Sequence, residues 1–265
     1  MLKYLDLKKV RISPSLIRII IDNGDILTFS YFIKLKYLYS SSTIYDFSIR
    51  KTSRLLKVSP NCIKAHLTKM NKMGIIKFTP SKNGKNNITF ISIAKICKKY
   101  NLKYNSRCGS IEYHNSENIQ IIKTRLYSKI LSNNIRNQKF SIKQKSDSLM
   151  RKKDQAEKLK KSGNVPDHVL RSLANERIKF DTFICCETIG RMFGATKMTG
   201  YNQLSKMVNM GLFSIKKKYI PILKNTTKKE FERLCKDGEL FKGKYFFNGN
   251  DSSIVKNAGY SIATL

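Results

Sequence analysis

The sequence predicts a mostly α-helical protein with small β-hairpins, an α+β chain of two similar domains joined by a basic helical linker. Three observations predict this. Apolar residues recur every three or four positions in several segments, which is the spacing of a helix with one buried face. Two similar octets, "KMNKMGII" (69–76) and "KMVNMGLF" (206–213), begin 137 residues apart, 206 minus 69. The 265 residues include 52 Lys and Arg against 18 Asp and Glu, a net charge of +34.

The positive charge covers the whole chain. Residues 1–97 carry 18 basic and 4 acidic side chains (+14), residues 98–180 carry 20 and 7 (+13), and residues 181–265 carry 14 and 7 (+7). Codon bias in an AT-rich genome explains Lys over Arg but not the scarcity of Asp and Glu. Basic side chains that neutralise phosphates release condensed counterions, so nucleic acid is the expected partner. Neither a membrane nor a small-molecule substrate is expected.

Residues 1–28 mix short apolar runs with a turn signal. The runs Met1–Ile12 and Ser15–Ile21 precede "DNGD" (22–25), in which Asn23-Gly24 is a strong hairpin dipeptide. We therefore expect a β-rich N-terminal segment that packs on the first domain.

Residues 29–97 predict the first domain, which starts with three helices. "YFIKLKYLYS" (31–40) has helical spacing, and Ser48 is the candidate N-cap of a short helix. The residues expected to face inward from this helix are Ile49, Leu55 and Leu56. Ser59 should cap a third helix over Pro60–Met73, where Pro60 suits the first turn.

A β-hairpin should follow the third helix. Its expected core stripe is Ile63, Leu67 and Met70, and Gly74 ends it. "IIKF" (75–78) and "NITFISI" (87–93) then predict two strands around the polar tip "TPSKNGKN" (79–86).

Residues 98–180 predict a basic helical linker that includes the first helix of the second domain. "NIQIIKTRLYSKILSNNI" (118–135) has helical spacing. "SIKQKSDSLMRKKDQAEKLKKS" (141–162) is strongly polar with few apolar anchors, so a long exposed helix and a mobile tether both stay open. "GNVP" (163–166) should break it, and "DHVLRSLANERI" (167–178) predicts a short helix capped by Asp167.

Residues 181–265 predict the second domain with a C-terminal extension. "CETIGRMFG" (186–194) predicts a helix that ends at Gly194, and Thr196 should cap the next, over 197–210, before Gly211. Its inward residues should be Leu204 and Met207. "LFSI" and "YIPIL" flank "KKK" (216–218) like a short hairpin, and a helix within 227–238 and weakly β-like residues follow.

The two octets belong to a longer repeat. Aligned without gaps, Leu55–Ile76 and Met192–Phe213 share Leu67/Leu204, Lys69/Lys206, Met70/Met207, Met73/Met210 and Gly74/Gly211. "SIRKTSRLLKVSPNCIKAHLTKMNKMGIIKF" (48–78) resembles winged helix-turn-helix DNA-binding modules, and "CETIGRMFGATKMTGYNQLSKMVNMGLFSI" (186–215) resembles them more loosely. The resemblance implies two winged helix-turn-helix domains in tandem that bind double-stranded DNA sequence-specifically, as in replication initiators or transcription regulators of phages and plasmids.

The resemblance implies that 60–73 and 197–210 are recognition helices in the major groove. Asn61 could pair with an adenine edge and Ala65 could contact a thymine methyl, while lysines would hold phosphates. His66 should pack rather than contact bases. Gly200 in place of Ile63 leaves open whether the second copy contacts DNA or protein. The expected DNA-binding residues are Asn61, Lys64, Ala65, Thr68, Lys69 and Lys72, Lys197, Tyr201, Asn202, Ser205 and Lys206, and at the wings Lys82, Lys85, Lys216, Lys217 and Lys218.

The motifs that signal catalysis or metal binding are missing from the sequence. There is no phosphate-binding loop, zincin motif or nucleophile elbow, so neither an enzyme nor a cofactor is expected. The six cysteines form no CxxC pair and the three histidines are scattered, so no metal is expected. Without a signal peptide or an apolar run near 18 residues, a reducing bacterial cytoplasm and its nucleoid are the expected location.

Alternatives of other classes stay open. The chain could coat or accompany a genome in a virion with little sequence choice, or serve as a winged-helix adaptor in a phage assembly. A homodimer or other phage proteins are further candidate partners.

Overall fold

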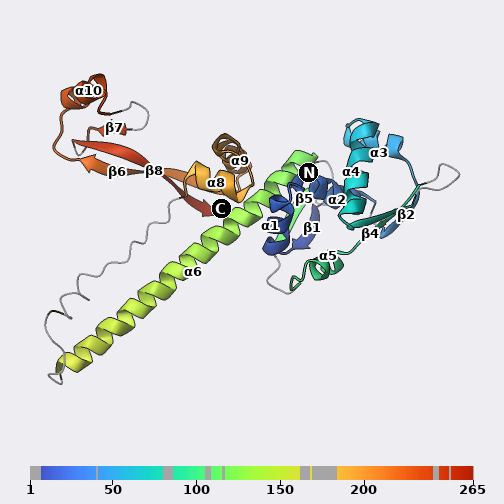
Figure 1. The fold of residues 1–265 in the computed structure, drawn as a ribbon, viewed down its shortest axis with the longest axis horizontal. Helices are drawn as coiled ribbons and strands as arrows, with labels where there is room; N and C mark the ends of the chain where they lie inside the picture. Colours follow the sequence, from blue (N-terminus) through green and yellow to red (C-terminus); the bar gives the residue numbers. More distant parts are fainter. Residues whose placement is uncertain are drawn as a thin grey trace, which may run out of the picture. The chain divides into compact units, whose positions relative to one another are not determined.

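The structure is a computed structural model that describes residues 7–39, 41–79, 86–104, 109–114, 117–161, 168, 184–240, 245–250 and 252–264. Over these residues the protein is mixed α+β, as predicted, with helices beside small antiparallel sheets (Figure 1). They fall into two compact units. The first comes from residues 1–131 and 190–207, and the second from residues 132–189 and 208–265.

The elements are named in chain order. The helices are α1 (Pro14–Asp22), α2 (Ile26–Leu38), α3 (Ile49–Leu56), α4 (Pro60–Lys72), α5 (Ile93–Lys99), α6 (Ile119–Lys161), α8 (Cys186–Met192), α9 (Lys197–Asn209) and α10 (Lys228–Lys236). The strands are β1 (Leu7–Ile12), β2 (Thr43–Phe47), β3 (Ile76–Thr79), β4 (Asn86–Phe90), β5 (Gly109–His114), β6 (Phe213–Leu223), β7 (Tyr245–Asn248) and β8 (Ser253–Thr264). The sheets have the strand orders β1-β5, β2-β4-β3 and β6-β8-β7.

The β-hairpin predicted within residues 1–28 is wrong, because Ser15–Ile21 lies in helix α1. The residues that α1 buries are Leu16, Ile17, Ile20 and Ile21. This one-sided stripe favours a helix over the hairpin that Asn23-Gly24 suggests. Gly24 instead closes the helix end, since its φ is +71° and its N–H donates to the Ile21 carbonyl.

Strand β1 pairs with β5, a strand that was not predicted. The two run antiparallel, with Leu7 opposite His114 and Ile12 opposite Gly109. Val10 and Ile111, which lie opposite each other, are both buried. The N-terminal strand is therefore fixed by a partner far along the chain rather than by a neighbouring turn.

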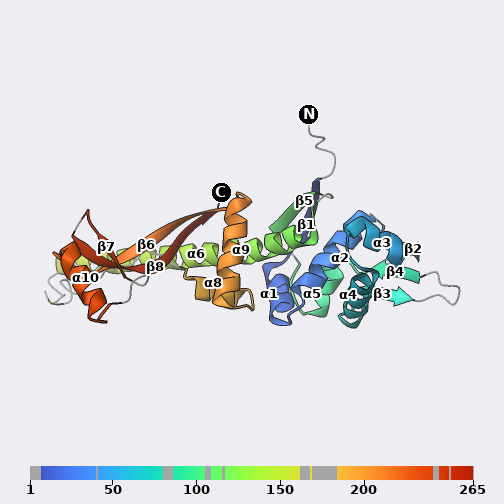
Figure 2. The ribbon, with the colours of Figure 1, turned by 90° about the horizontal axis from the view of Figure 1, so that it is seen from above.

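The predicted helices of the first domain are confirmed together with their caps. Ser48 accepts a hydrogen bond from the Lys51 N–H at 3.2 Å and caps α3, and Ser59 accepts one from the Cys62 N–H at 3.2 Å and caps α4. The stripe Ile63, Leu67 and Met70 is buried as predicted, and Gly74 follows α4 with a φ of +65°. Figure 2 shows α4 beside α3 and β3.

Two features of this region differ from prediction. Leu55 is 54% exposed rather than inward, because α3 turns its i, i+3, i+4 face to the core and buries Thr52 and Ser53 there. Strand β2, also not predicted, pairs with β4, so the predicted β3–β4 hairpin becomes a three-stranded sheet. The hairpin tip, residues 80–85, lies outside the described residues.

Helix α6 decides between the alternatives left open for the polar segment. It is one continuous helix of 43 residues, so residues 141–161 are helix rather than tether. Most of its charged side chains between Lys139 and Lys158 are exposed, which explains how so polar a segment stays in water. The helix predicted for 167–178 lies outside the described residues, apart from His168.

The hairpin predicted around "KKK" is wrong, because β6 continues through Lys216–Lys218 as one strand of 11 residues. These lysines pair with Ser261, Tyr260 and Gly259 of β8, so the partner of β6 comes from the C-terminal end. The run of three lysines contains no Gly, Asn or Pro, the residues that favour a tight turn. Lys is also well tolerated on an edge strand such as β6.

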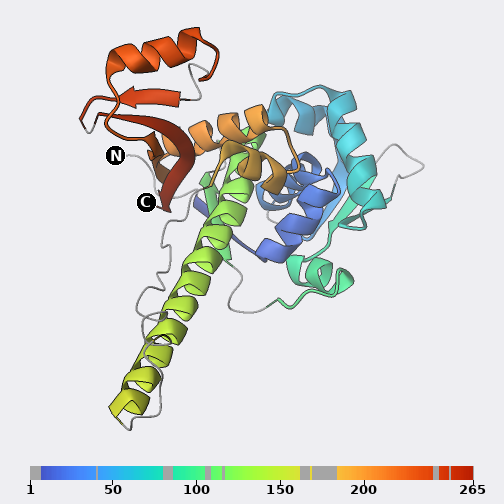
Figure 3. The same cartoon turned by 60° about the vertical axis from the view of Figure 1, so that its left-hand side comes forward.

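The helical and β-like extension predicted after β6 is confirmed. Thr227 caps α10 by accepting the Glu230 N–H at 3.2 Å. The rings of Phe231 and Phe247 lie 6.4 Å apart and join α10 to β7, and Figure 3 shows this helix beside the strand.

Candidate nucleic-acid interface

Helices α3 and α4 form a surface with only one sign of charge. The segment 49–72 contains no Asp or Glu, and all its basic side chains are exposed. They are Arg50, Lys51, Arg54, Lys57, Lys64, Lys69 and Lys72. A surface that carries only positive charge attracts polyanions, so the surface of α3 and α4 is the candidate interface of the first unit.

The six residues predicted to face outward from α4 are all exposed. They are Asn61, Lys64, Ala65, Thr68, Lys69 and Lys72. The Thr68 hydroxyl donates to the Lys64 carbonyl at 3.0 Å, so it is oriented back along its own helix. Lys64 and Lys72 have no carboxylate partner among the described residues, which leaves both ammonium groups available to an anion.

Lys69 differs from the other basic residues of α4. Its Nζ lies 2.5 Å from Oδ1 of Asp25, whose side chain is only 11% exposed. A largely buried carboxylate needs a paired charge, and Lys69 supplies it. The predicted phosphate contact of Lys69 would therefore compete with an internal ion pair that the sequence did not reveal.

His66 packs against α2, as predicted. Its Nδ1 lies 3.0 Å from the Thr28 hydroxyl, and its ring stacks on Tyr31 with centroids 4.1 Å apart. Burial, with the Lys69 charge as a second cause, lowers the pKa of His66 below its ordinary value of 6.5. The imidazole therefore holds α4 on α2 in its neutral form.

Acidification should destabilise the fold through His66. Because its pKa is lowered in the folded state, the unfolded chain binds more protons below pH 6.5. The stability from neutral His66 is complete above that pH and is lost as the pH falls. Urea unfolding between pH 7.5 and 5.5 should show this loss, and His66→Gln should flatten the profile. If the free energy of unfolding fell with pH equally steeply in the variant, His66 would not be the group responsible.

Helix α9 presents the residues predicted for the second copy, with one exception. Lys197, Asn202 and Lys206 are exposed, and Tyr201 is 46% exposed. Ser205 is half-buried. The buried face consists of Gly200, Gln203, Leu204 and Met207. Gly200 is thus buried although it contributes no side chain to this face.

The structure describes only part of the set of lysines predicted at the wing tips. Lys82 and Lys85 lie outside the described residues. Lys216 is exposed on β6 rather than on a loop, and the side chains of Lys217 and Lys218 are not described.

In the two copies the helix-turn-helix pair and the strand after it begin at matching positions, at an offset of 137. The matched starts are Ile49 of α3 with Cys186 of α8, Pro60 of α4 with Lys197 of α9, and Ile76 of β3 with Phe213 of β6. The glycines after α4 and α9, Gly74 and Gly211, have φ values of +65° and +67°. We call α2 through β4 the first repeat, and the start of α6 with α8, α9 and β6 the second repeat.

The N-caps of the two repeats match as well. Thr196 accepts the Thr199 N–H at 3.3 Å, as Ser59 does for Cys62. Cys185 stands at the position of Ser48, and its sulfur accepts the Thr188 N–H at 3.4 Å. The hydrogen bond from the Thr188 hydroxyl lowers the pKa of the Cys185 thiol, a consequence of its capping role.

A left-handed residue follows the first helix of each pair at matched positions. Lys57 has a φ of +53° and its counterpart Gly194 a φ of +60°. A side chain is strained there, so Lys57→Gly should stabilise the protein by about 0.5–1 kcal/mol. Lys51→Gly, inside α3, should destabilise it by about 1 kcal/mol. Urea unfolding checks both signs, and a loss of stability in Lys57→Gly would contradict the prediction.

The repeat extends into the preceding helix, a match that was not predicted. The spacing I-x-T-x2-Y-x3-L occurs in α2 and again at the start of α6, and every member is buried. The matched residues are Ile26, Thr28, Tyr31 and Leu35 with Ile122, Thr124, Tyr127 and Leu131. The Thr124 hydroxyl donates to Oε1 of Gln203 at 3.3 Å, and Gln203 stands where the first repeat has His66.

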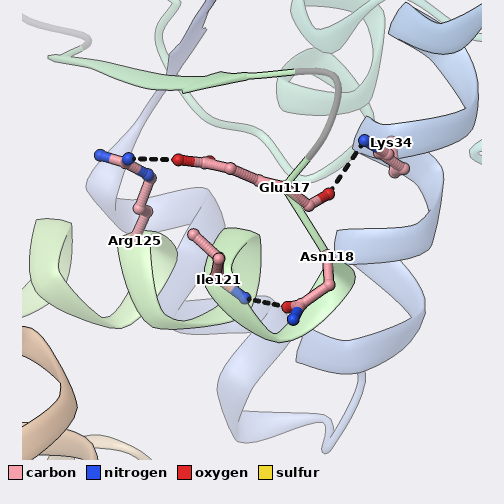
Figure 4. A network of polar contacts seen from close by, with 5 residues as sticks. All are labelled: Lys34, Glu117, Asn118, Ile121 and Arg125. Atoms are coloured by element: carbon pink, nitrogen blue, oxygen red, sulfur yellow. Dashed lines mark hydrogen bonds and ion pairs between the residues drawn. The ribbon is translucent and has the colours of Figure 1, made fainter. Parts of the chain in front are cut away.

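A polar network fixes the start of α6 to α2 (Figure 4). Asn118 Oδ1 accepts the Ile121 N–H at 3.0 Å, and Glu117 pairs with Arg125 at 2.7 Å. The buried Lys34 of α2 donates to the Glu117 carbonyl at 3.0 Å. The first helices of both repeats are thereby held together in the first unit.

The described residues contain no group of His, Cys, Asp and Glu that could hold a metal ion. Within the same residues, no disulfide involves Cys62, Cys97, Cys185, Cys186 or Cys235. Among the helices described, none combines the length and the apolar character that a membrane span requires. Comparison with protein-family models, with curated proteins and with solved structures found no match to the chain.

Proposed function

We propose that the protein binds double-stranded DNA through two winged helix-turn-helix modules, one in each repeat. The first repeat supports this by its topology. Its order is helix α2, strand β2, helices α3 and α4, and strands β3 and β4, with the sheet order β2-β4-β3. A winged helix has this order, and its second helix-turn-helix helix enters the major groove.

The observation that carries the proposal is the outward face of α4. Asn61 and Ala65 lie exposed one turn apart near its N-terminus, where an amide can contact an adenine and a methyl group a thymine. Lys64 and Lys72 are exposed on the same helix, and neither has a carboxylate partner among the residues that the structure describes. The absence of carboxylates from 49–72 removes the repulsion that phosphates would otherwise meet.

The second repeat supports a tandem arrangement, because its helix boundaries, caps and left-handed residues follow those of the first. Two modules on one chain increase affinity through effective concentration when both can engage one duplex. Such a protein suits a replication initiator or transcription regulator of a phage or plasmid, acting at repeated or extended sites in a bacterial cytoplasm.

Selection from a pool of random duplexes tests the proposal. The full chain should enrich a defined sequence and bind it at least tenfold more tightly than random duplex at physiological salt. Equal affinity for both with a steep salt dependence would support genome coating instead. No binding to either, even at low salt, would favour a protein–protein adaptor.

A further inference from the structure

The second repeat carries a pair of lysines that the first repeat does not have. Thr124 of α6 and Gln203 of α9 are both buried and joined by a hydrogen bond, so these helix surfaces are in contact. Lys123 directly precedes Thr124, and Lys206 lies one turn after Gln203. The two side chains therefore flank the same polar contact.

The environment of Lys123 is unusual for a lysine. Its side chain is half-buried, and Nζ lies 5.7 Å from the centroid of the Tyr127 ring. Tyr127 is fixed in turn by Phe193, with ring centroids 4.3 Å apart. Burial, followed by the charge of Lys206, lowers the pKa of Lys123. Lys123 and Lys206 thus lie on the two helices that the Thr124–Gln203 hydrogen bond joins.

The matched positions of the first repeat have the opposite electrostatics. Lys69 corresponds to Lys206 and is neutralised there by Asp25. The α2–α6 match puts Ile121 in place of Asp25 and Lys123 in place of Leu27. The second repeat has therefore lost the carboxylate and gained an ammonium group, and neither lysine has a carboxylate partner among the described residues.

Two neighbouring ammonium groups repel each other, and burial of one adds a desolvation cost. An anion that bridges them removes both costs. We infer that Lys123 and Lys206 form a binding site for one phosphate of nucleic acid, placed beside the exposed Tyr201 and Asn202 of α9. The inference rests on the proposed function and names Lys123 as a contact residue on the first helix of the second repeat.

The salt dependence of binding tests this site. Lys123→Met should weaken binding to a random 20-base-pair duplex by about five- to tenfold and reduce the slope of log affinity against log salt by about 0.9. Its melting temperature should stay equal or rise, because a repulsion is removed. Lys95→Met, which removes an exposed charge from α5, is the matched control and should leave the slope nearly unchanged.

A second variant tests the same site by adding a carboxylate. Ile121→Asp recreates the first repeat's acidic position in the first turn of α6, where a negative charge suits the helix dipole. It should keep the fold and reduce the salt slope as Lys123→Met does. Slopes equal to that of Lys95→Met in both variants would overturn the inference.

Inorganic phosphate separates this inference from the proposed function. Phosphate should shift the side-chain NMR signals of Lys123 and Lys206 in the full chain, and Lys123→Met should abolish the shift at Lys206. If the unaltered protein shows this shift but does not bind duplex, the DNA-binding proposal fails and the phosphate site stands. Duplex binding with unaltered slopes in the variants overturns the site alone.

Discussion

Replacing Lys64 and Lys72 by glutamate is expected to weaken duplex binding roughly 100-fold at near-physiological salt. Both side chains are exposed on α4, and in the described part of the chain neither pairs with a carboxylate, so each change removes a proposed phosphate contact and adds a repulsive charge. Fluorescence anisotropy over a salt series measures the affinity. The slope of log affinity against log salt should fall by about two.

The control carries the same charge change elsewhere in the first unit. Lys95→Glu with Lys98→Glu places two acidic side chains on the exposed face of α5. Overall charge alone would weaken both double variants equally, and that outcome would contradict the assignment of α4. Circular dichroism should show unchanged helix content in both, because all four positions lie in solvent.

Leu67→Ala is expected to destabilise the protein by about 2–5 kcal/mol, because it opens a cavity in a closed core. Leu67 is only 1% exposed and lies in the α4 stripe with Ile63 and Met70. Chemical denaturation measures this change in the free energy of unfolding, provided that the slope of that free energy against denaturant concentration is the same in both proteins. Loss of this core should also remove DNA binding, since α4 would no longer be held on α2.

Leu55→Ala is the matched control for this change. The same side chain is truncated one helix earlier, but Leu55 is 54% exposed. Its loss should change the free energy of unfolding by about 0.5 kcal/mol or less. Equal effects at Leu67 and Leu55 would contradict the burial that distinguishes them.

Local signals in the sequence predicted local structure well. Ser48, Ser59 and Thr196 each cap the helix that follows them, because a short hydroxyl side chain satisfies an N–H of the first turn wherever the helix packs. The α4 stripe was predicted for the same reason, since helical spacing alone separates buried from exposed positions. All six outward residues of α4 follow from that spacing.

The sequence did not predict which strands pair when the two partners lie far apart along the chain. β1 pairs with β5 and β6 with β8, and no turn residue in the sequence indicates either partner. The prediction that Leu55 faces inward was wrong because a helix of eight residues offers two plausible faces, and tertiary packing decides between them. Lys123, which we propose as a phosphate contact, was not predicted because its surroundings depend on α9, where Gln203 contacts Thr124 across 79 residues of sequence.

The contacts of the first unit also determine the order in which its parts can fold during synthesis. Arg18 of α1 donates to the Met192 carbonyl at 3.2 Å across 174 residues of sequence, and residues 190–207 belong to the same unit. Contacts of such separation form late, since the intervening chain must first be made and then closed into a loop. Helices α3 and α4 can assemble soon after they leave the ribosome, whereas the unit that holds them is complete only after residue 207 has emerged.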